Sequence, residues 1–268
     1  MTLHAEVTGS GPPLVLLHGI TGSIASWEPA LALLAARHRV VAIDLPGHGG
    51  SPVPDGGLPR VADQLVGTLD RLGIERASWL GYSLGGRAAL HVALAHPDRV
   101  DRLVLESTSP GLADAAARTT RASDDDLLAL RLERDGLEPF VDAWMAQPLF
   151  ATQRRRAPDL LARERALRLG NDPVRLAAAL RVMGTGRQAS LWERLSSLRL
   201  PILVVAGEDD HQYRAIAAAM TAGLPDARVA VIPDAGHAVH LENPVPFWSV
   251  VEAFLALPIA ERMEGVAP

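Results

Sequence analysis

The stretch that decides the fold is Gly81-Tyr82-Ser83-Leu84-Gly85-Gly86-Arg87, which reads GYSLGGR. It follows a short apolar, strand-like run (77–80) and precedes a helix-like run (88–94). A strand, a serine between glycines and a helix predict a sharp turn that holds the serine hydroxyl at a helix N-terminus. The turn leaves no room for side chains two residues before and after the serine, where Gly81 and Gly85 stand. The stretch therefore predicts an activated serine, acting as a nucleophile or as a base.

An arginine near this serine points to the charge of the substrate. Arg87 follows Ser83 by four residues, which places both on one face of the predicted helix. A guanidinium beside the reactive hydroxyl favours a substrate that carries a carboxylate.

Composition narrows the possible functions. The chain has 268 residues, 48% apolar and 21% charged, which fits one packed α/β domain or a core with an insertion. A net charge of −5 argues against nucleic-acid binding. The chain has no cysteine and no lysine, which excludes disulfides, thiolate nucleophiles and lysine Schiff bases. Neither a signal-peptide pattern nor an apolar run of membrane-spanning length is present, so we expect a cytoplasmic protein without a membrane partner.

Short apolar runs alternate with helix-like segments along most of the chain. This alternation predicts an α/β fold with a mostly parallel, doubly wound sheet, whose strands are buried on both faces. The strand-like runs are 13–17, 40–43, 77–80, 102–105, 202–206 and 229–232, and the helix-like segments are 27–36, 59–72, 84–96, 214–222 and 244–255.

The alternation is interrupted by a long segment without strand-like runs. We predict a core formed by residues 1–107 and 198–268, and an inserted helical cap at 108–197. From Ser107 to Leu198 the chain holds 14 arginines and 12 acidic residues. Part of this charge is expected on solvated helix surfaces, but a basic cap over the serine also favours an anionic substrate.

A reactive serine needs a histidine to take its proton and a carboxylate to orient that histidine. Glu208-Asp209-Asp210 follows the strand-like run 202–206, and His237 follows 229–232. The carboxyl ends of parallel strands share one sheet edge, where ligands bind. The residues alone leave the choice among the three acids open. His240, in the same loop as His237, is expected to pack or to support the site.

The loop after the first long strand-like run supplies a further element. In His18-Gly19-Ile20, the turn would aim the backbone N–H of Ile20 at the serine. Together with the N–H of Leu84 it would form an oxyanion hole. His18 itself is expected to hold the loop.

These motifs resemble the α/β-hydrolase superfamily over the full chain. Within it, the chain resembles the 2-succinyl-6-hydroxy-2,4-cyclohexadiene-1-carboxylate (SHCHC) synthases of menaquinone biosynthesis. The stretches that carry this narrower resemblance are GYSLGGR itself, 106–112 (ESTSPGL), 140–144 (FVDAW), 147–151 (QPLFA), 183–186 (MGTG), 190–192 (SLW) and 236–240 (GHAVH).

The resemblance implies a lyase that needs no cofactor or metal. It implies elimination of pyruvate from 2-succinyl-5-enolpyruvyl-6-hydroxy-3-cyclohexene-1-carboxylate, a small anion with several carboxylates. It also selects Asp210 as the acid, so that Ser83, Asp210 and His237 are the implied catalytic residues. Ile20 and Leu84 would hold the enolate oxygen. The protein would be a monomer or a small homo-oligomer.

The resemblance further implies which side chains bind the substrate. These are Tyr82, Arg87, Arg121, Trp144 and Arg168, with Arg118 as an alternative to Arg121. On sequence grounds alone, Trp144 fits a plain core aromatic equally well.

Two other functions are consistent with the motifs. A serine carboxylesterase or C–C bond hydrolase of the same fold would use the same three groups through an acyl-enzyme, although Arg87 argues for an anionic ligand. A non-catalytic small-molecule-binding protein would be expected to lack one of the three groups, and this chain has all of them.

Overall fold

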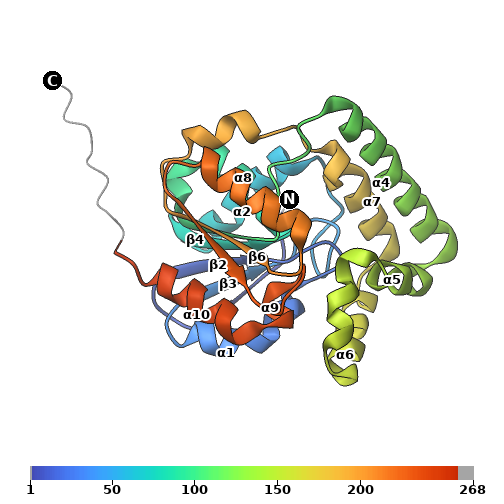
Figure 1. The fold of residues 1–268 in the computed structure, drawn as a ribbon, viewed down its shortest axis with the longest axis horizontal. Coiled ribbons are helices and arrows are strands. Elements are labelled where there is room, and N and C mark those ends of the chain that lie inside the picture. The colour runs from blue at the N-terminus through green and yellow to red at the C-terminus, as the bar shows by residue number, and fades with distance from the viewer. Residues whose placement is uncertain (1, 259–268) are drawn as a thin grey trace.

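The computed structural model describes residues 2–258. Its centre is a seven-stranded sheet in the order β1-β3-β2-β4-β5-β6-β7, seen edge-on among the helices in Figure 1. All neighbouring strands are parallel except β1, which is antiparallel to β3. This confirms the predicted mostly parallel sheet. The strands are β1 (Ala5–Thr8), β2 (Pro13–Leu17), β3 (Arg39–Ile43), β4 (Ala77–Tyr82), β5 (Val100–Glu106), β6 (Ile202–Gly207) and β7 (Ala227–Ile232).

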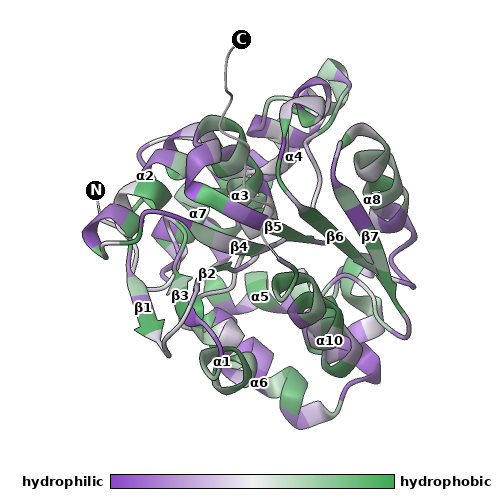
Figure 2. Ribbon diagram, turned by 90° about the vertical axis from the view of Figure 1, so that its left-hand side faces the viewer, coloured by the Kyte–Doolittle hydropathy of each residue, from purple (hydrophilic) through white to green (hydrophobic). Residues whose placement is uncertain are grey.

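Helices cover both faces of the sheet, so the fold is doubly wound (Figures 1 and 2). One apolar core lies between the sheet and α2 (Leu58–Arg71), α3 (Leu84–Ala95) and α8 (His211–Gly223). The second lies between the sheet and α1 (Glu28–Ala35) and α10 (Pro244–Leu255). The inner strands carry the strongest hydropathy in Figure 2, because both of their faces are buried.

The two edge strands differ from the sequence prediction. The prediction missed β1, a four-residue strand with a mostly exposed pattern, because it is too short and too polar to give a buried apolar run. The expectation that every strand is buried on both faces is wrong for β7. Val229 and Val231 are 47% and 44% exposed, since an edge strand has a neighbour on only one side.

A helical insertion separates β5 from β6. It consists of α4 (Ala115–Asp135), α5 (Leu137–Met145), η3 (Pro148–Arg155), α6 (Pro158–Leu169), α7 (Pro173–Met183), η4 (Thr185–Arg187) and η5 (Trp192–Ser197). In Figure 1, α4 to α7 stand together at one end of the sheet. We call this segment the cap; its boundaries at 108 and 197 stay a prediction. No helix in residues 2–258 is long and apolar enough to cross a membrane.

Polar contacts fasten the cap to loops of the core. The Asn171 amide donates to the C=O of Thr21 (2.8 Å) and accepts from the N–H of Gly49 (3.0 Å). The Arg175 guanidinium donates to the C=O of Ser51 (3.0 Å). These contacts close one side of the space between the cap and the carboxyl ends of the strands.

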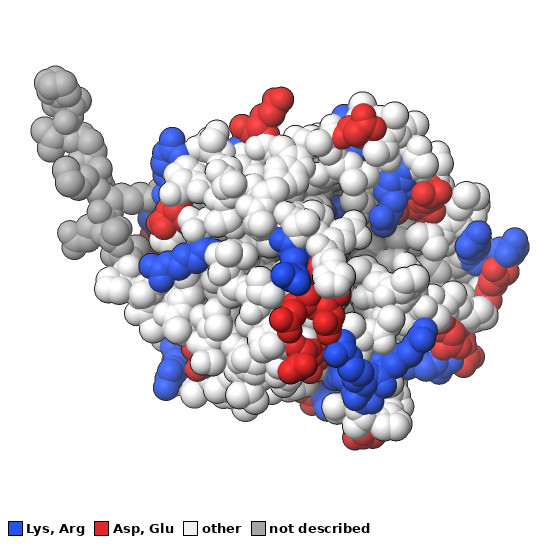
Figure 3. Space-filling view, in the orientation of Figure 1, with Lys and Arg blue, Asp and Glu red and all other residues white. Residues whose placement is uncertain are grey.

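Most of the cap's positive charge is neutralised on its surface. Figure 3 shows positive side chains over the α6 region with negative ones directly beside them. Arg163 pairs with Glu28 (2.5 Å) and Arg165 with Asp142 (2.6 Å). The excess of cap arginines therefore says less about the substrate than the few that face the interior.

Candidate active site

The serine stands in a strained turn between β4 and α3. Ser83 has φ 51° and ψ −108°, a left-handed backbone conformation that costs energy in a residue with a side chain. Its N–H donates to the C=O of Glu106 (2.9 Å), and its C=O accepts from the Thr108 hydroxyl (2.7 Å). A Cβ at Gly85 would lie 2.1 Å from the C=O oxygen of Leu17. Close packing against β2 and β5 thus fixes the turn.

A hydrogen-bonded chain runs from this serine to the carboxylate after β6. His237 Nε2 lies 3.3 Å from Ser83 Oγ, and His237 Nδ1 lies 2.8 Å from Asp210 Oδ2. The other oxygen, Asp210 Oδ1, accepts from the backbone N–H of Tyr213 (3.1 Å) and so caps α8. Glu208 and Asp209 are exposed. The structure therefore brings together the three predicted residues and leaves the neighbouring acids outside.

Two glutamates hold the loop that carries the histidine. Glu242 accepts from the N–H groups on both sides of His237, those of Gly236 (2.9 Å) and Ala238 (3.1 Å). Glu106 Oε1 accepts from the N–H of His240 (3.0 Å) and lies 2.8 Å from its Nδ1. His240 is buried behind the site, in the supporting role that the sequence suggested.

The predicted oxyanion groups lie at the same place. Ile20 and Leu84 both line the cavity around Ser83. Within residues 2–258, neither backbone N–H donates a hydrogen bond to the protein. His18 supports this loop, because its Nε2 accepts from the N–H of Leu45 (3.0 Å) and its Nδ1 lies 2.7 Å from the C=O of Gly19. Burial lowers the pKa of His18, which keeps the ring neutral and able to accept.

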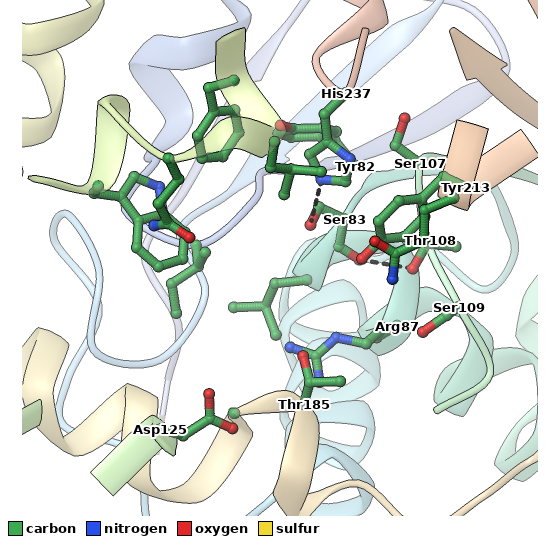
Figure 4. Close-up of a pocket in the computed structure, with 18 of the residues that line it drawn as sticks. Tyr82, Ser83, Arg87, Ser107, Thr108, Ser109, Asp125, Thr185, Tyr213 and His237 are labelled. Carbon is green, nitrogen blue, oxygen red and sulfur yellow. Dashed lines mark hydrogen bonds between the residues drawn. The ribbon is translucent and has the colours of Figure 1, made fainter. Parts of the chain in front are cut away.

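One cavity, shown in Figure 4, collects every predicted site residue except Asp210. Asp210 contacts His237 Nδ1, on the side of the ring away from Ser83. It lies between the core and the cap. The predicted residues along its wall are Ile20, Tyr82, Ser83, Leu84, Arg87, Arg121, Trp144, Arg168 and His237. Trp144 packs against Phe140 and Phe150 as well as facing the cavity, so both sequence interpretations of this residue describe part of its surroundings.

Arg87 is the buried cation of this cavity. It donates to the C=O of Met183 (2.9 Å) and to Gln188 Oε1 (3.2 Å). In the part of the chain that the structure describes, no carboxylate lies within ion-pair distance of it. Burial lowers the pKa of Arg87 to about 10, so the guanidinium stays charged at neutral pH. An unpaired buried cation is costly unless an anion binds beside it.

The two cap arginines already have acidic partners. Arg121 Nε donates to Asp125 Oδ1 and Arg168 Nη1 to Glu164 Oε2, both at 2.8 Å and both four residues apart on one helix. Arg168 Nε is buried without a hydrogen-bond partner in residues 2–258. Arg118, the alternative to Arg121, donates instead to backbone carbonyls at 112 and 113 and does not line the cavity.

Several cavity residues were not found from the sequence. They are hydroxyl, amide, carboxyl and apolar groups such as Ser107, Thr108, Ser109, Asp125, Gln147, Phe150, Thr185 and Tyr213. Tyr213 packs its ring against His237 at 4.5 Å between ring centroids. Its position three residues after Asp210, on the first turn of α8, is the one sequence signal that could have indicated it. Residues 2–258 contain no cluster of three or more His, Asp or Glu side chains suited to a metal ion.

Comparisons with known proteins agree with this geometry. Residues 12–244 match the family model of the alpha/beta hydrolase fold. A Bacillus subtilis protein assigned as a 2-succinyl-6-hydroxy-2,4-cyclohexadiene-1-carboxylate synthase is 41% identical, over 93% of this chain and 92% of its own. The synthase of that name from Serratia proteamaculans is 35% identical, over 92% of this chain and 94% of its own.

A solved structure of the same family is also similar. MenH from S. aureus superimposes with a TM-score of 0.90 at 32% identity, covering 94% of this chain and 97% of that one. The fold, the relatives and their near-complete overlap lead to one conclusion: this chain belongs to the alpha/beta hydrolase fold and, within it, to the family of 2-succinyl-6-hydroxy-2,4-cyclohexadiene-1-carboxylate synthases.

Proposed function

We propose that this chain eliminates pyruvate from 2-succinyl-5-enolpyruvyl-6-hydroxy-3-cyclohexene-1-carboxylate and so forms SHCHC. The observation that carries the proposal is a serine–histidine–aspartate chain beside a buried arginine that has no acidic partner in residues 2–258. A hydrolase of neutral esters has no use for that cation, whereas a substrate with several carboxylates does.

The first step in this proposal is removal of a proton. His237 takes the proton of Ser83, and the serine oxygen abstracts the proton α to the succinyl carbonyl. Asp210, 2.8 Å from His237 Nδ1, orients the ring and stabilises its charged form. The abstracted proton restores the Ser83 hydroxyl, the proton that Ser83 gave up stays on His237, and the electron pair moves into an enolate.

The second step breaks a carbon–oxygen bond. The enolate re-forms the ketone in conjugation with the ring and expels the enolpyruvyl oxygen. The leaving group is the enolate of pyruvate, which takes up one proton on carbon and departs as pyruvate; the loss of the proton from His237 balances this uptake and restores the starting state. Ile20 and Leu84 would hold the enolate oxygen through N–H groups that have no partner in residues 2–258. Developing negative charge there is also favoured by the N-terminus of α3.

Cations and aromatic groups would position the substrate. Arg87 is the proposed site for one carboxylate, and the free Nε of Arg168 offers a second donor. Arg121 would bind through the guanidinium nitrogens that do not face Asp125. Tyr82 and Trp144 would confine the ring of the substrate.

The cytoplasmic location and the monomeric or small oligomeric state stay predictions of the sequence.

The test is pyruvate release from the enolpyruvyl precursor, followed by a lactate-dehydrogenase-coupled assay. We expect turnover by the parent protein and little burst hydrolysis of p-nitrophenyl acetate. Rapid ester turnover with a burst, and no pyruvate, would show instead an esterase with an acyl-enzyme.

A further inference from the structure

We propose that the Tyr213 phenol is a substrate-binding group that donates a hydrogen bond to the same carboxylate as Arg87. This inference rests on the proposed function, because it names a further contact in the same cavity. It assigns a specific task to a residue that no motif indicated.

The position of Tyr213 carries the argument. Its side chain lines the cavity, and its backbone N–H is held by Asp210 Oδ1 at 3.1 Å. Its ring packs edge-on against His237 with 4.5 Å between centroids. Figure 4 shows Tyr213 on the same flank of the cavity as Thr108 and Asp125 on the opposite flank, with the Arg87 side chain extending between them toward Thr185. Tyr213 and Arg87 therefore line the same cavity, in which one carboxylate could meet both.

The hydroxyl of Tyr213 is available for such a contact. No hydrogen bond to it occurs in residues 2–258, and the residue is half-buried at the wall of the cavity. If the side chain at position 213 served only to pack against His237, a phenylalanine would do the same, and the hydroxyl would have no task. A polar group that faces a cavity beside a cation is instead suited to an anion.

Electrostatics supports the same assignment. Burial raises the pKa of Tyr213, and the Arg87 charge lowers it in part. Tyr213 therefore keeps its proton at neutral pH and can donate. After burial, Tyr213 is the largest influence on the pKa of Arg87 as well, which agrees with their place in the same cavity.

Tyr82 provides a matched comparison. The chain has two tyrosines, and both line the cavity. Burial is the main influence on the pKa of both tyrosines, but the arginine that lowers the pKa of Tyr82 is Arg168, whereas the arginine with the larger effect on Tyr213 is Arg87. Removing either hydroxyl leaves the ring in place, so the two variants separate the contribution of each phenol oxygen.

The experiment measures binding and turnover in parallel. Binding of succinate, a carboxylate probe that resembles one arm of the proposed substrate, is measured by calorimetry for the parent, Tyr213→Phe, Tyr82→Phe, Arg87→Gln and the two double variants with Arg87→Gln. Elimination is measured on the same preparations, with kcat and KM determined separately.

We expect Tyr213→Phe to weaken succinate binding about 10- to 100-fold, the loss of one hydrogen bond to a charged group, and to raise KM more than it lowers kcat. In the Arg87→Gln background the same change should have less than a threefold effect, because the shared carboxylate is already lost. Tyr82→Phe should change succinate binding by the same factor in the parent and in the Arg87→Gln background.

Two results would overturn the inference: succinate binding that is unchanged in Tyr213→Phe, or a parent protein that does not bind succinate. A parent that binds succinate but releases no pyruvate would refute the proposed function and leave the Tyr213 contact standing. A parent that releases pyruvate, with Tyr213→Phe unchanged in both assays, would refute the contact alone.

Discussion

Replacing Arg87 by methionine separates what the buried charge does for the reaction from what it does for the fold. Methionine has a similar length and no charge. If Arg87 holds a substrate carboxylate in a desolvated site, its loss should cost roughly 2–5 kcal/mol of transition-state stabilisation. This corresponds to a decrease in kcat/KM of about 30- to 5,000-fold.

The effect on stability should be small, because two contributions oppose each other. Burial lowers the pKa of Arg87 from 12.5 to about 10, so keeping the charge in place costs the folded state about 3 kcal/mol. The substitution removes that cost but also removes the hydrogen bonds to Met183 and Gln188, worth about 1.5 kcal/mol each. The free energy of unfolding should therefore stay within about 1.5 kcal/mol of the parent value.

Arg118→Met is the matched control. Arg118 also donates to two oxygens, the carbonyls of Leu112 and Ala113, but lies outside the cavity. Pyruvate release and urea unfolding are measured for both variants, and we expect Arg118→Met to keep kcat/KM within twofold. The reasoning is refuted if Arg87→Met keeps kcat/KM within threefold of the parent, or if both variants lose activity equally.

Three further predictions concern the serine, the turn around it and a buried histidine. Ser83→Ala should lose at least about 1,000-fold in kcat while binding substrate as tightly as the parent; activity within tenfold of the parent would remove the serine from the mechanism. Gly85→Ala should give little folded protein, because its Cβ would meet the C=O of Leu17 at 2.1 Å, whereas Gly67→Ala in α2, with open space around it, should stabilise by up to about 1 kcal/mol; circular dichroism melts compare the two, and equal melting temperatures would contradict the steric argument. Burial lowers the pKa of His48 from 6.5 to about 3. As the pH falls, the unfolded chain therefore takes up a proton at this ring before the folded protein does. The free energy of unfolding should fall by up to about 5 kcal/mol as the pH drops from 6.5 toward 3. Urea unfolding at pH 7 and pH 4 should show this loss reduced in His48→Asn, and an unchanged pH dependence would count against it.

The core of the site could be predicted because its determinants are local. The glycines around Ser83 leave one turn geometry open, and Asp210 and His237 each follow an apolar run that forms a strand. Parallel strands then bring these positions to one edge regardless of the loops between them. The order β4-β5-β6-β7 sets the loops that carry these residues within reach of one another, and the sequence pattern did not predict that order.

The cap contributes to the site through contacts between residues that lie far apart in the sequence, and no local sequence pattern indicates such contacts. The bonds from Arg87 to the cap span 96 and 101 residues of sequence. The pairing of Arg121 with Asp125, in contrast, follows the four-residue spacing of helix neighbours and could have been recognised from the sequence. Tyr213 was missed because a tyrosine one turn into a helix carries no sign of which way its hydroxyl points. β1 was missed because it is short and polar.

The core and the cap supply different groups to the site, and this has a consequence for engineering. The hydrogen-bonded chain of Ser83, His237 and Asp210 is supplied wholly by loops of the sheet. Two of the groups that would select the substrate's anionic arms, Arg121 and Arg168, come from one continuous stretch of the insertion, whereas Arg87 and Tyr213 come from the core helices α3 and α8. A chimera in which the cap is replaced by the equivalent segment of another member of the fold would keep the three groups that transfer the proton. Its ligand specificity would change. Directed evolution toward new substrates should therefore concentrate its libraries on α4 to α7.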